Sequence, residues 1–293
     1  MKKKKQHNSK KKKGSGFGDF AIILGGLSVL GFLLGAGFYL FVNTEKQYAL
    51  DDNLCPKQGA RATVAVLLDT TDQLAPVTKA AVSARISDTL MRLPRFYRLS
   101  VYTMDEDGLQ KIPITTVCNP GSSDQMGKLE RKGLTANPTM INEKFLQFTD
   151  SIKEAVSKVF KENFEAQKSP LFSAMRDLSM ELPKPVAIDK DTKNPGGNKY
   201  QAGKNRIIYV TDLFEHTDVF SVYRSGTDFS AFKRSRATEK FGKKYNQTDL
   251  EFWVIRRNTK GLKTIDLQKF WAKVIKLEFV SDISSMITLT GEI

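Results

Sequence analysis

The chain has 293 residues, with 46 Lys and Arg, 32 Asp and Glu, and a formal net charge of +14. This length accommodates one large domain or two small ones, and the 40% hydrophobic content excludes disorder over most of the chain and a small disulfide-stapled scaffold. Two His and two Cys residues are too few for a structural zinc site of the usual composition.

The N-terminal segment combines a basic run with a long apolar stretch. Eight lysines precede the first acidic residue, and without them the net charge of +14 falls to +6. Residues 20–42, from Phe20 to Val42, are uncharged, and their number is close to the ~20 residues that cross ~30 Å of hydrocarbon as a helix. We expect an uncleaved transmembrane anchor, with signal-peptide cleavage near Gly35 as the alternative.

The charges around this stretch predict its orientation. Because the lysines precede it and few basic residues follow it, the positive-inside rule places residues 1–19, a basic tail, in the cytoplasm. A linker at residues 43–59 and a domain at residues 60–293 then lie outside the cytoplasm. The expected setting is a bacterial inner membrane with the domain in the periplasm.

Two residue pairs carry predictions that depend on this topology. Gly31 and Gly35 lie one helical turn apart, which would let two anchors approach closely and form a homo-oligomer; the alternative is that glycine is simply common in such helices. Cys55 and Cys118 are predicted to form a disulfide in an oxidising compartment, which would stabilise the fold by roughly 4 kcal/mol. Two buried free thiols are the alternative.

From residue 60 onward, short apolar runs alternate with amphipathic segments. Residues 62–68 are continuously apolar without period-2 alternation, which is typical of a strand covered on both faces. The order of elements predicts an open, mostly parallel α/β sheet with helices on both faces and one antiparallel edge strand. The predicted elements are strands at 62–68, 99–103, 112–117, 207–210 and 252–255, helices at 75–93, 142–166, 170–182 and 266–277, and a solvated loop at 183–206.

Two acidic residues follow strands of this predicted sheet. Asp69 ends the first strand and Asp212 follows the strand at 207–210, so both are expected at the carboxyl ends of strands, where such sheets bind ligands. Thr71 adds a hydroxyl two residues after Asp69. Carboxylate and hydroxyl oxygens suit a hard divalent cation such as Mg²⁺. The alternative is that Asp69, Thr71 and Asp212 only cap the segments that follow them.

At these positions the sequence resembles von Willebrand factor type A domains, which have a Rossmann-like sheet. Asp69 and Thr71 match the opening Asp-x-Ser/Thr of the metal-ion-dependent adhesion site, the segment beginning Ser169-Pro170-Leu171 resembles the middle motif, and the segment ending Thr211-Asp212 resembles the last. The resemblance covers about residues 60–277. Gln73 and Leu213 stand where the family has a second Ser and a Gly. The resemblance implies the metal ligands Asp69, Thr71, Gln73, Ser169 and Asp212, with one coordination position open to a partner's acidic residue.

Other polar groups give weaker signals. His216 follows Asp212 closely and is a candidate to support the site or to transfer a proton; the alternative is a solvent-facing His with neither role. A basic segment is interleaved with aromatic residues near residue 240. We interpret it as an exposed charged face or a docking surface for an acidic protein, and we expect no nucleic-acid partner. The segment contains Lys233, Arg234, Arg236, Lys240, Lys243, Lys244, Phe232, Phe241 and Tyr245.

These observations favour an interaction protein over an enzyme. The first hypothesis is a membrane-anchored domain that binds a protein partner at the carboxyl rim of its sheet, through a divalent cation where one is bound. A metal-dependent hydrolase that uses the same carboxylates to activate water is one alternative. The other is a structural subunit of an envelope-spanning secretion, conjugation or defence machine in which the metal site is vestigial.

Overall fold

The computed structural model describes residues 26, 28–39, 50–122, 125, 137–162, 166–188, 200–242, 248–279 and 282–292. It divides the chain into two compact units, Met1–Lys46 and Gln47–Ile293. In the first unit residues 28–39 are helical, and within the described residues no helix is both long enough and apolar enough to cross a membrane. The predicted basic tail lies outside the described residues, as do residues 20–25, 27 and 40–42 of the predicted anchor.

Gly31 and Gly35 lie in the described helix of the first unit. A Cβ atom added at either glycine would meet no atom within 4 Å. Among the described residues, no atom therefore crowds these two positions, and homo-oligomer formation stays a prediction.

The second unit is built around one sheet, which has seven strands among the described residues. The order is β3-β2-β1-β5-β6-β7, and β4 also pairs with β2. The pairs β1–β2, β1–β5, β5–β6 and β6–β7 are parallel, whereas β3 and β4 are antiparallel to β2. The strands are β1 (Thr63–Asp69), β2 (Arg98–Asp105), β3 (Gly108–Leu109), β4 (Thr115–Cys118), β5 (Asn205–Thr211), β6 (Thr248–Arg256) and β7 (Ile283–Glu292).

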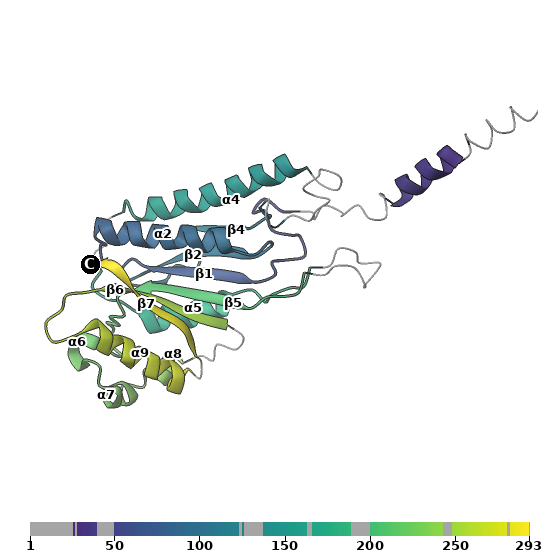
Figure 1. Ribbon diagram of the computed structural model, residues 1–293. Coiled ribbons are helices and arrows are strands. Elements are labelled where there is room, and N and C mark those ends of the chain that lie inside the picture. The colour runs from purple at the N-terminus through teal and green to yellow at the C-terminus, as the bar shows by residue number, and fades with distance from the viewer. Residues whose placement is uncertain are drawn as a thin grey trace, which may run out of the picture. The chain divides into compact units, whose positions relative to one another are not determined.

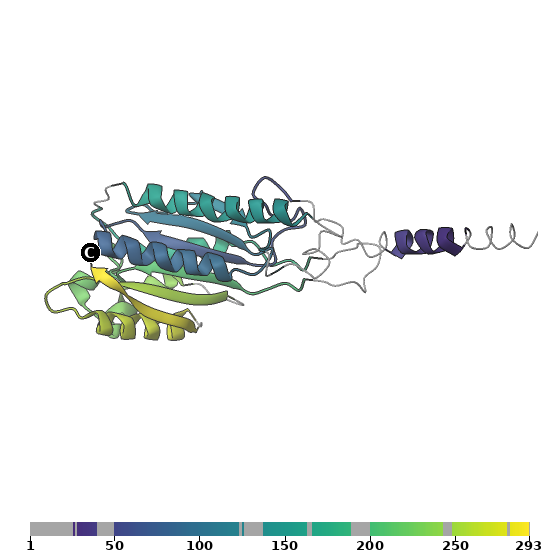
Figure 2. The same ribbon diagram turned by 45° about the horizontal axis from the view of Figure 1, so that its top comes forward.

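Helices cover both faces of the sheet, as Figures 1 and 2 show. One layer contains α2 and α4, and the other contains α5 to α9. The predicted α/β class with a mostly parallel sheet is therefore confirmed. The helices are α2 (Pro76–Arg92), α4 (Pro138–Val159), α5 (Leu171–Glu181), α6 (Val222–Ser225), α7 (Phe229–Arg234), α8 (Ala237–Phe241) and α9 (Thr264–Glu278).

Strand β1 shows why its sequence lacks alternation. All seven of its residues are buried, because each face of the strand meets a helical layer. Val64, Val66 and Leu68 belong to the core under α2 and α4, whereas Ala65 and Leu67 belong to the core under α5 and α9. Side chains of β1 alternate between the two faces of the sheet, but the residues on both faces are apolar, so the sequence shows no alternation of polar and apolar residues.

Several predicted boundaries differ from the structure. Helix α4 begins at Pro138 and ends at Val159, instead of spanning 142–166, because the Asn137 side chain accepts a hydrogen bond from the Met140 N–H (3.3 Å) and Pro138 starts the helix. Strand β7 was not predicted; its Ser- and Thr-rich sequence fits a half-exposed edge strand rather than a buried one. The edge next to β2 carries two short antiparallel strands, β3 and β4, instead of one.

The predicted disulfide between Cys55 and Cys118 is confirmed, with both residues buried and their Cα atoms 4.7 Å apart. Cys118 pairs with Arg98, the first residue of β2. The disulfide therefore lies at the amino ends of the parallel strands, where the described chain of the second unit begins at Leu50. The opposite end of the sheet, to the left in Figure 1, carries Asp69.

Candidate functional site

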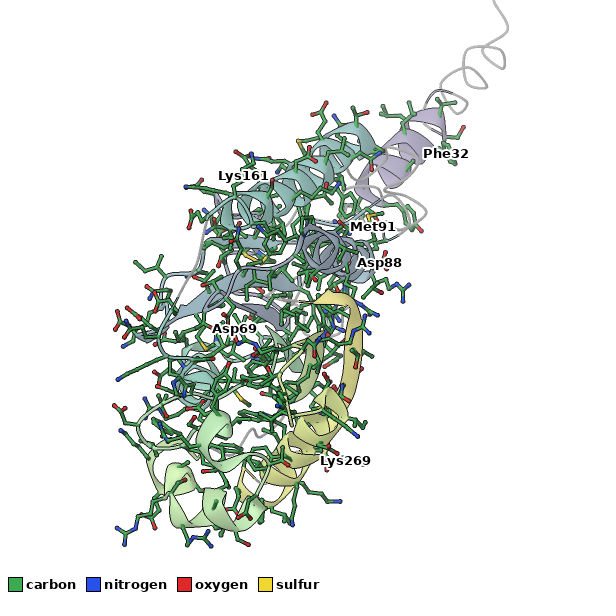
Figure 3. All side chains as sticks on the ribbon, turned by 90° about the vertical axis from the view of Figure 1, so that its left-hand side faces the viewer. Phe32, Asp69, Asp88, Met91, Lys161 and Lys269 are labelled. Atoms are coloured by element: carbon green, nitrogen blue, oxygen red, sulfur yellow. A yellow bond between two sulfur atoms is a disulfide. The ribbon has the colours of Figure 1, made fainter. Side chains whose placement is uncertain are left out.

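The carboxyl ends of β1 and β5 form the point where the sheet changes direction of winding. These two strands are parallel neighbours, but β1 leads into α2 on one face and β5 leads toward α6 on the other. The segments that leave the two strands therefore diverge, which is where open α/β sheets form a crevice. Figure 3 looks onto this end of the sheet, with Asp69 labelled. We call this end the carboxyl rim.

Asp69 links the two strands at the rim. Its Oδ1 accepts hydrogen bonds from the Thr71 N–H (3.1 Å) and the Thr71 hydroxyl (2.7 Å), and its Oδ2 accepts one from the Thr211 hydroxyl of β5 (2.8 Å). Burial raises the pKa of Asp69, while the hydrogen bonds from Thr71 and Thr211 oppose that rise. Both carboxylate oxygens are thus engaged by threonines.

Asp212 lies beside Asp69 and is 4% exposed. Its Oδ1 accepts a hydrogen bond from the Phe214 N–H (2.9 Å), and its Oδ2 lies 2.6 Å from Nε of Arg257. Burial and the nearby charge of Asp69 raise the pKa of Asp212 to about 7, against the opposing effect of Arg257. The predicted meeting of Asp69 and Asp212 at one edge of the sheet is confirmed.

Arg257, which the sequence interpretation missed, contributes a fixed positive charge to this cluster. It follows the last residue of β6, the neighbour of β5, and it also pairs with the carboxylate of Asp72. Burial alone would lower the pKa of Arg257, but the charges of Asp212 and Asp72 outweigh burial and raise it. Arg257 lies just after the strand predicted at residues 252–255, and this position in the sequence is the signal that would have indicated it as a site residue.

Leu213 has a backbone conformation that is unusual for a residue with a side chain. Leu213 has a φ of 68°, in the left-handed region that favours glycine, which is the residue the family usually has there. Its carbonyl accepts a hydrogen bond from the indole N–H of Trp271 (2.8 Å), and its side chain is fully buried. Packing therefore holds leucine in a conformation that costs it about 1 kcal/mol.

Glu215 lies behind the rim and caps helix α5. Its side chain is completely buried, and it accepts hydrogen bonds from the Phe172 N–H (2.9 Å) and the Thr217 hydroxyl (2.9 Å). Burial raises the pKa of Glu215 to about 8, although these hydrogen bonds oppose the rise. Ser169 and His216 exchange two backbone hydrogen bonds (3.0 and 2.8 Å), so the segment before α5 is tied to the loop after β5.

The predicted metal ligands are brought together only in part. Asp69, Thr71 and Asp212 line one pocket together with Asp72, Leu74 and Ile255. Gln73 is exposed and lines a neighbouring pocket with Lys79 and Phe160. The Ser169 hydroxyl is buried, and among the described residues it has no hydrogen-bond partner.

The carboxylate oxygens of Asp212 and its neighbours cannot act as ligands of a bound divalent cation while Arg257 is in place. The Arg257 guanidinium contacts the carboxylates of Asp212 and Asp72, so a cation would have to displace it to use them as ligands. Within the described part of the chain, no three or more His, Cys, Asp or Glu side chains are grouped to hold a metal ion. Binding of Mg²⁺ or another cation thus stays a prediction that these contacts do not support.

The remaining candidates lie apart from this pocket. His216 is half-buried, with Nδ1 2.8 Å from the Ser221 hydroxyl, and its ring lies edge-on to Tyr223. In the basic segment, Phe232 and Phe241 are buried in the core, so they are not available to stack on nucleic-acid bases. Lys243, Lys244 and Tyr245 lie outside the described residues.

No protein-family model matches the sequence, and no curated protein is significantly similar to it. Solved structures with similarity include a von Willebrand factor type A protein from Catenulispora acidiphila, with 11% identity, a TM-score of 0.36, and coverage of 72% of this chain and 36% of that chain. The PilB minor pilin from Streptococcus sanguinis has 10% identity, a TM-score of 0.41, and coverage of 80% and 58%.

A single-residue mutant of that pilin has 11% identity, a TM-score of 0.42, and coverage of 80% of this chain and 59% of that chain. The chain thus spans less than two thirds of the length of these three structures. Because their TM-scores are below 0.5, the fold is assigned from the strand order observed here, and function is argued from the rim.

Proposed function

We propose that this chain is an interaction protein that binds a protein partner at the carboxyl rim. The observation that carries the proposal is the convergence of Asp69, Thr71, Asp72 and Asp212 on one pocket at the point where the sheet changes its winding direction. Gln73 is exposed and Asp72 is half-buried beside this pocket, so these two side chains of the rim are open to a macromolecule, whereas Asp69, Thr71 and Asp212 lie beneath them as buried support.

A binding role is favoured over a hydrolytic one by the contacts of the two buried acids. A general base needs a carboxylate that is available to accept a proton from water. The oxygens of Asp69 are engaged by Thr71 and Thr211, and Asp212 is paired with Arg257. We therefore place partner recognition, rather than turnover, at the rim.

The proposal includes a membrane anchor at residues 20–42 with the domain outside the cytoplasm. The Cys55–Cys118 disulfide supports this placement, because disulfides persist mainly in oxidising compartments. The described chain of the domain begins at the amino ends of the parallel strands, whereas the rim lies at their carboxyl ends. The rim therefore lies at the end of the domain opposite to Leu50, the first described residue of the domain.

Photo-crosslinking in native cells tests the partner site. A photoreactive amino acid is placed at Gln73 on the rim, at Lys269 on the exposed side of α9, or at Arg92, the exposed last residue of α2 at the opposite end of the sheet. We expect a discrete protein adduct from Gln73 and none from Arg92. An adduct from all three positions, or from none, contradicts the proposal.

A structural subunit of an envelope machine is the second candidate. The pairing of Arg257 with Asp72 and Asp212 favours it, because an occupied acidic pocket is compatible with a domain that binds through another face. In the same experiment, an adduct from Lys269 without one from Gln73 supports this candidate and excludes the rim as the partner site.

A further inference from the structure

Arg257 is held on several sides by residues of the acidic pocket and by aromatic residues beside it. Its Nε lies 2.6 Å from Asp212 Oδ2, its Nη2 pairs with Asp72, and its Nη1 donates a hydrogen bond to the Tyr223 hydroxyl (2.5 Å). The guanidinium carbon also lies 5.2 Å from the centre of the Phe214 ring. The Arg257 side chain is only 17% exposed, so the group is fixed rather than freely solvated.

The positive charge of Arg257 balances carboxylates that would otherwise repel one another. Asp69, Asp72 and Asp212 line the same pocket, and two of the three are buried. Neighbouring carboxylates in one site need a cation or a shared proton to be tolerated. The planar guanidinium is suited to this role because it donates to several acceptors at fixed angles and keeps its charge when partly buried.

We propose that Arg257 is a built-in cation that takes the place of a divalent metal ion between Asp72 and Asp212. The guanidinium offers no open coordination position, so a partner's acidic residue does not bind here through a metal. Partner binding at the rim is then independent of divalent cations. Cation-independent partner binding rests on the proposed function. The replacement of a metal ion by Arg257 can be tested on the purified chain without a partner.

The proposal predicts that loss of the guanidinium opens the pocket to a divalent cation. The oxygen atoms of Asp69, Thr71, Asp72 and Asp212 are positioned by β1, β5 and the segments that directly follow them, and they remain when Arg257 is shortened. Oxygen donors of this kind suit Mg²⁺ and Mn²⁺. The variant Arg257→Ser removes the charge and leaves space, and Arg257→Gln removes the charge with less loss of volume.

The experiment measures thermal unfolding of the purified full chain in chelator and in millimolar Mn²⁺, together with Mn²⁺ binding by electron paramagnetic resonance. The wild type is expected to bind no Mn²⁺ and to keep the same melting temperature in both conditions. Arg257→Ser is expected to melt several degrees lower in chelator, to recover in Mn²⁺, and to bind the ion. The second variant, Arg257→Gln, should respond in the same direction.

Three further variants serve as controls. Arg256→Ser removes the exposed neighbouring arginine and should behave as the wild type. Arg257→Lys keeps a positive charge and should stay indifferent to Mn²⁺. Adding Asp212→Asn to Arg257→Ser should abolish the Mn²⁺ response, because the carboxylate that would hold the ion is lost.

Two outcomes overturn the proposal. One is Mn²⁺ binding by the wild type that is lost in Asp212→Asn, since the guanidinium would not then replace the ion. The other is absence of a Mn²⁺ response in both Arg257→Ser and Arg257→Gln, including chains that stay unfolded with and without the ion. Neither measurement involves a partner, so failure of the Gln73 crosslink leaves this result intact, and the reverse also holds.

Discussion

At the scale of single residues, the buried acids at the rim and behind it are stabilised in different ways. Asp69 is held by threonine hydroxyls, Asp212 by an arginine, and Glu215 by a helix N-terminus. In each case burial raises the pKa, and the neighbouring donors oppose it. These carboxyl groups bind protons more tightly in the folded chain than in the unfolded chain, which links stability to pH.

The sign of this linkage gives a prediction for Glu215. A raised folded pKa means that its contribution to the free energy of unfolding is complete below its ordinary pKa of 4.5 and is lost as the pH rises through about 8. Glu215→Gln keeps an oxygen to accept the Phe172 N–H but does not titrate. Denaturant unfolding across this range should therefore show a shallower fall in stability for Glu215→Gln, by on the order of 1 kcal/mol per pH unit.

Asp69 and Asp212 contribute in the same direction, so the fall should be reduced in Glu215→Gln and not abolished. The exposed rim residue Glu162 provides a matched control, because Glu162→Gln removes a carboxylate that is not buried. A pH dependence in Glu215→Gln that equals that of the wild type would show that Glu215 does not carry the linkage.

At the scale of elements, helix α5 anchors the layer of helices α5 to α9. Phe172 near its N-terminus is fully buried, with ring centres 4.4 Å from Trp271 of α9 and 5.3 Å from Phe232 of α7. The same residue donates its N–H to Glu215. Phe172 therefore contributes both to the packing of the core, through its ring, and to the capping of α5 by Glu215, through its N–H.

Phe172→Ala is expected to lower the free energy of unfolding by about 3–5 kcal/mol, because it removes a large buried ring and leaves a cavity. Denaturant unfolding measures this change. Leu146→Ala on α4 is the control, since Leu146 is 60% exposed and its truncation should change stability by less than about 0.5 kcal/mol. Similar losses in the two variants would mean that Phe172 is not an anchor of the core.

At the scale of the whole molecule, the disulfide and the rim occupy opposite ends of one sheet. Cys118 pairs with the first residue of β2, and Asp69 is the last residue of β1. A parallel sheet places every strand's carboxyl end on one side, so the disulfide and the candidate partner site are separated by the length of the strands, about 20 Å.

The proposed topology is tested with a reporter fused after Ile293 that is active only in an exported, oxidising compartment. We expect activity with the full chain, because residues 20–42 would carry the domain across the membrane and residues 1–19 would stay inside. The same fusion without residues 20–42 is the control and should be inactive. An inactive full-length fusion that accumulates to the control's level would contradict export.

The sequence by itself determined the features that depend on local periodicity and on strand ends. It located most strands and long helices, because apolar spacing reflects which faces are covered, and it placed Asp69 and Asp212 at one rim, because parallel strands end on the same side. The disulfide between Cys55 and Cys118 could be predicted because the chain has only these two cysteines. Strand β7 was missed because a half-exposed Ser- and Thr-rich edge has no strong apolar period.

Only the tertiary structure decided what surrounds the two acids. Arg257 meets Asp72 across a separation of 185 residues, and Thr211 meets Asp69 across 142, so no local pattern records either contact. The capping of α5 by Glu215 likewise joins residues 43 apart. Such pairs form because neighbouring strands deliver distant side chains to one edge, and that neighbourhood is set by the order of strands in the sheet rather than by their order in the chain.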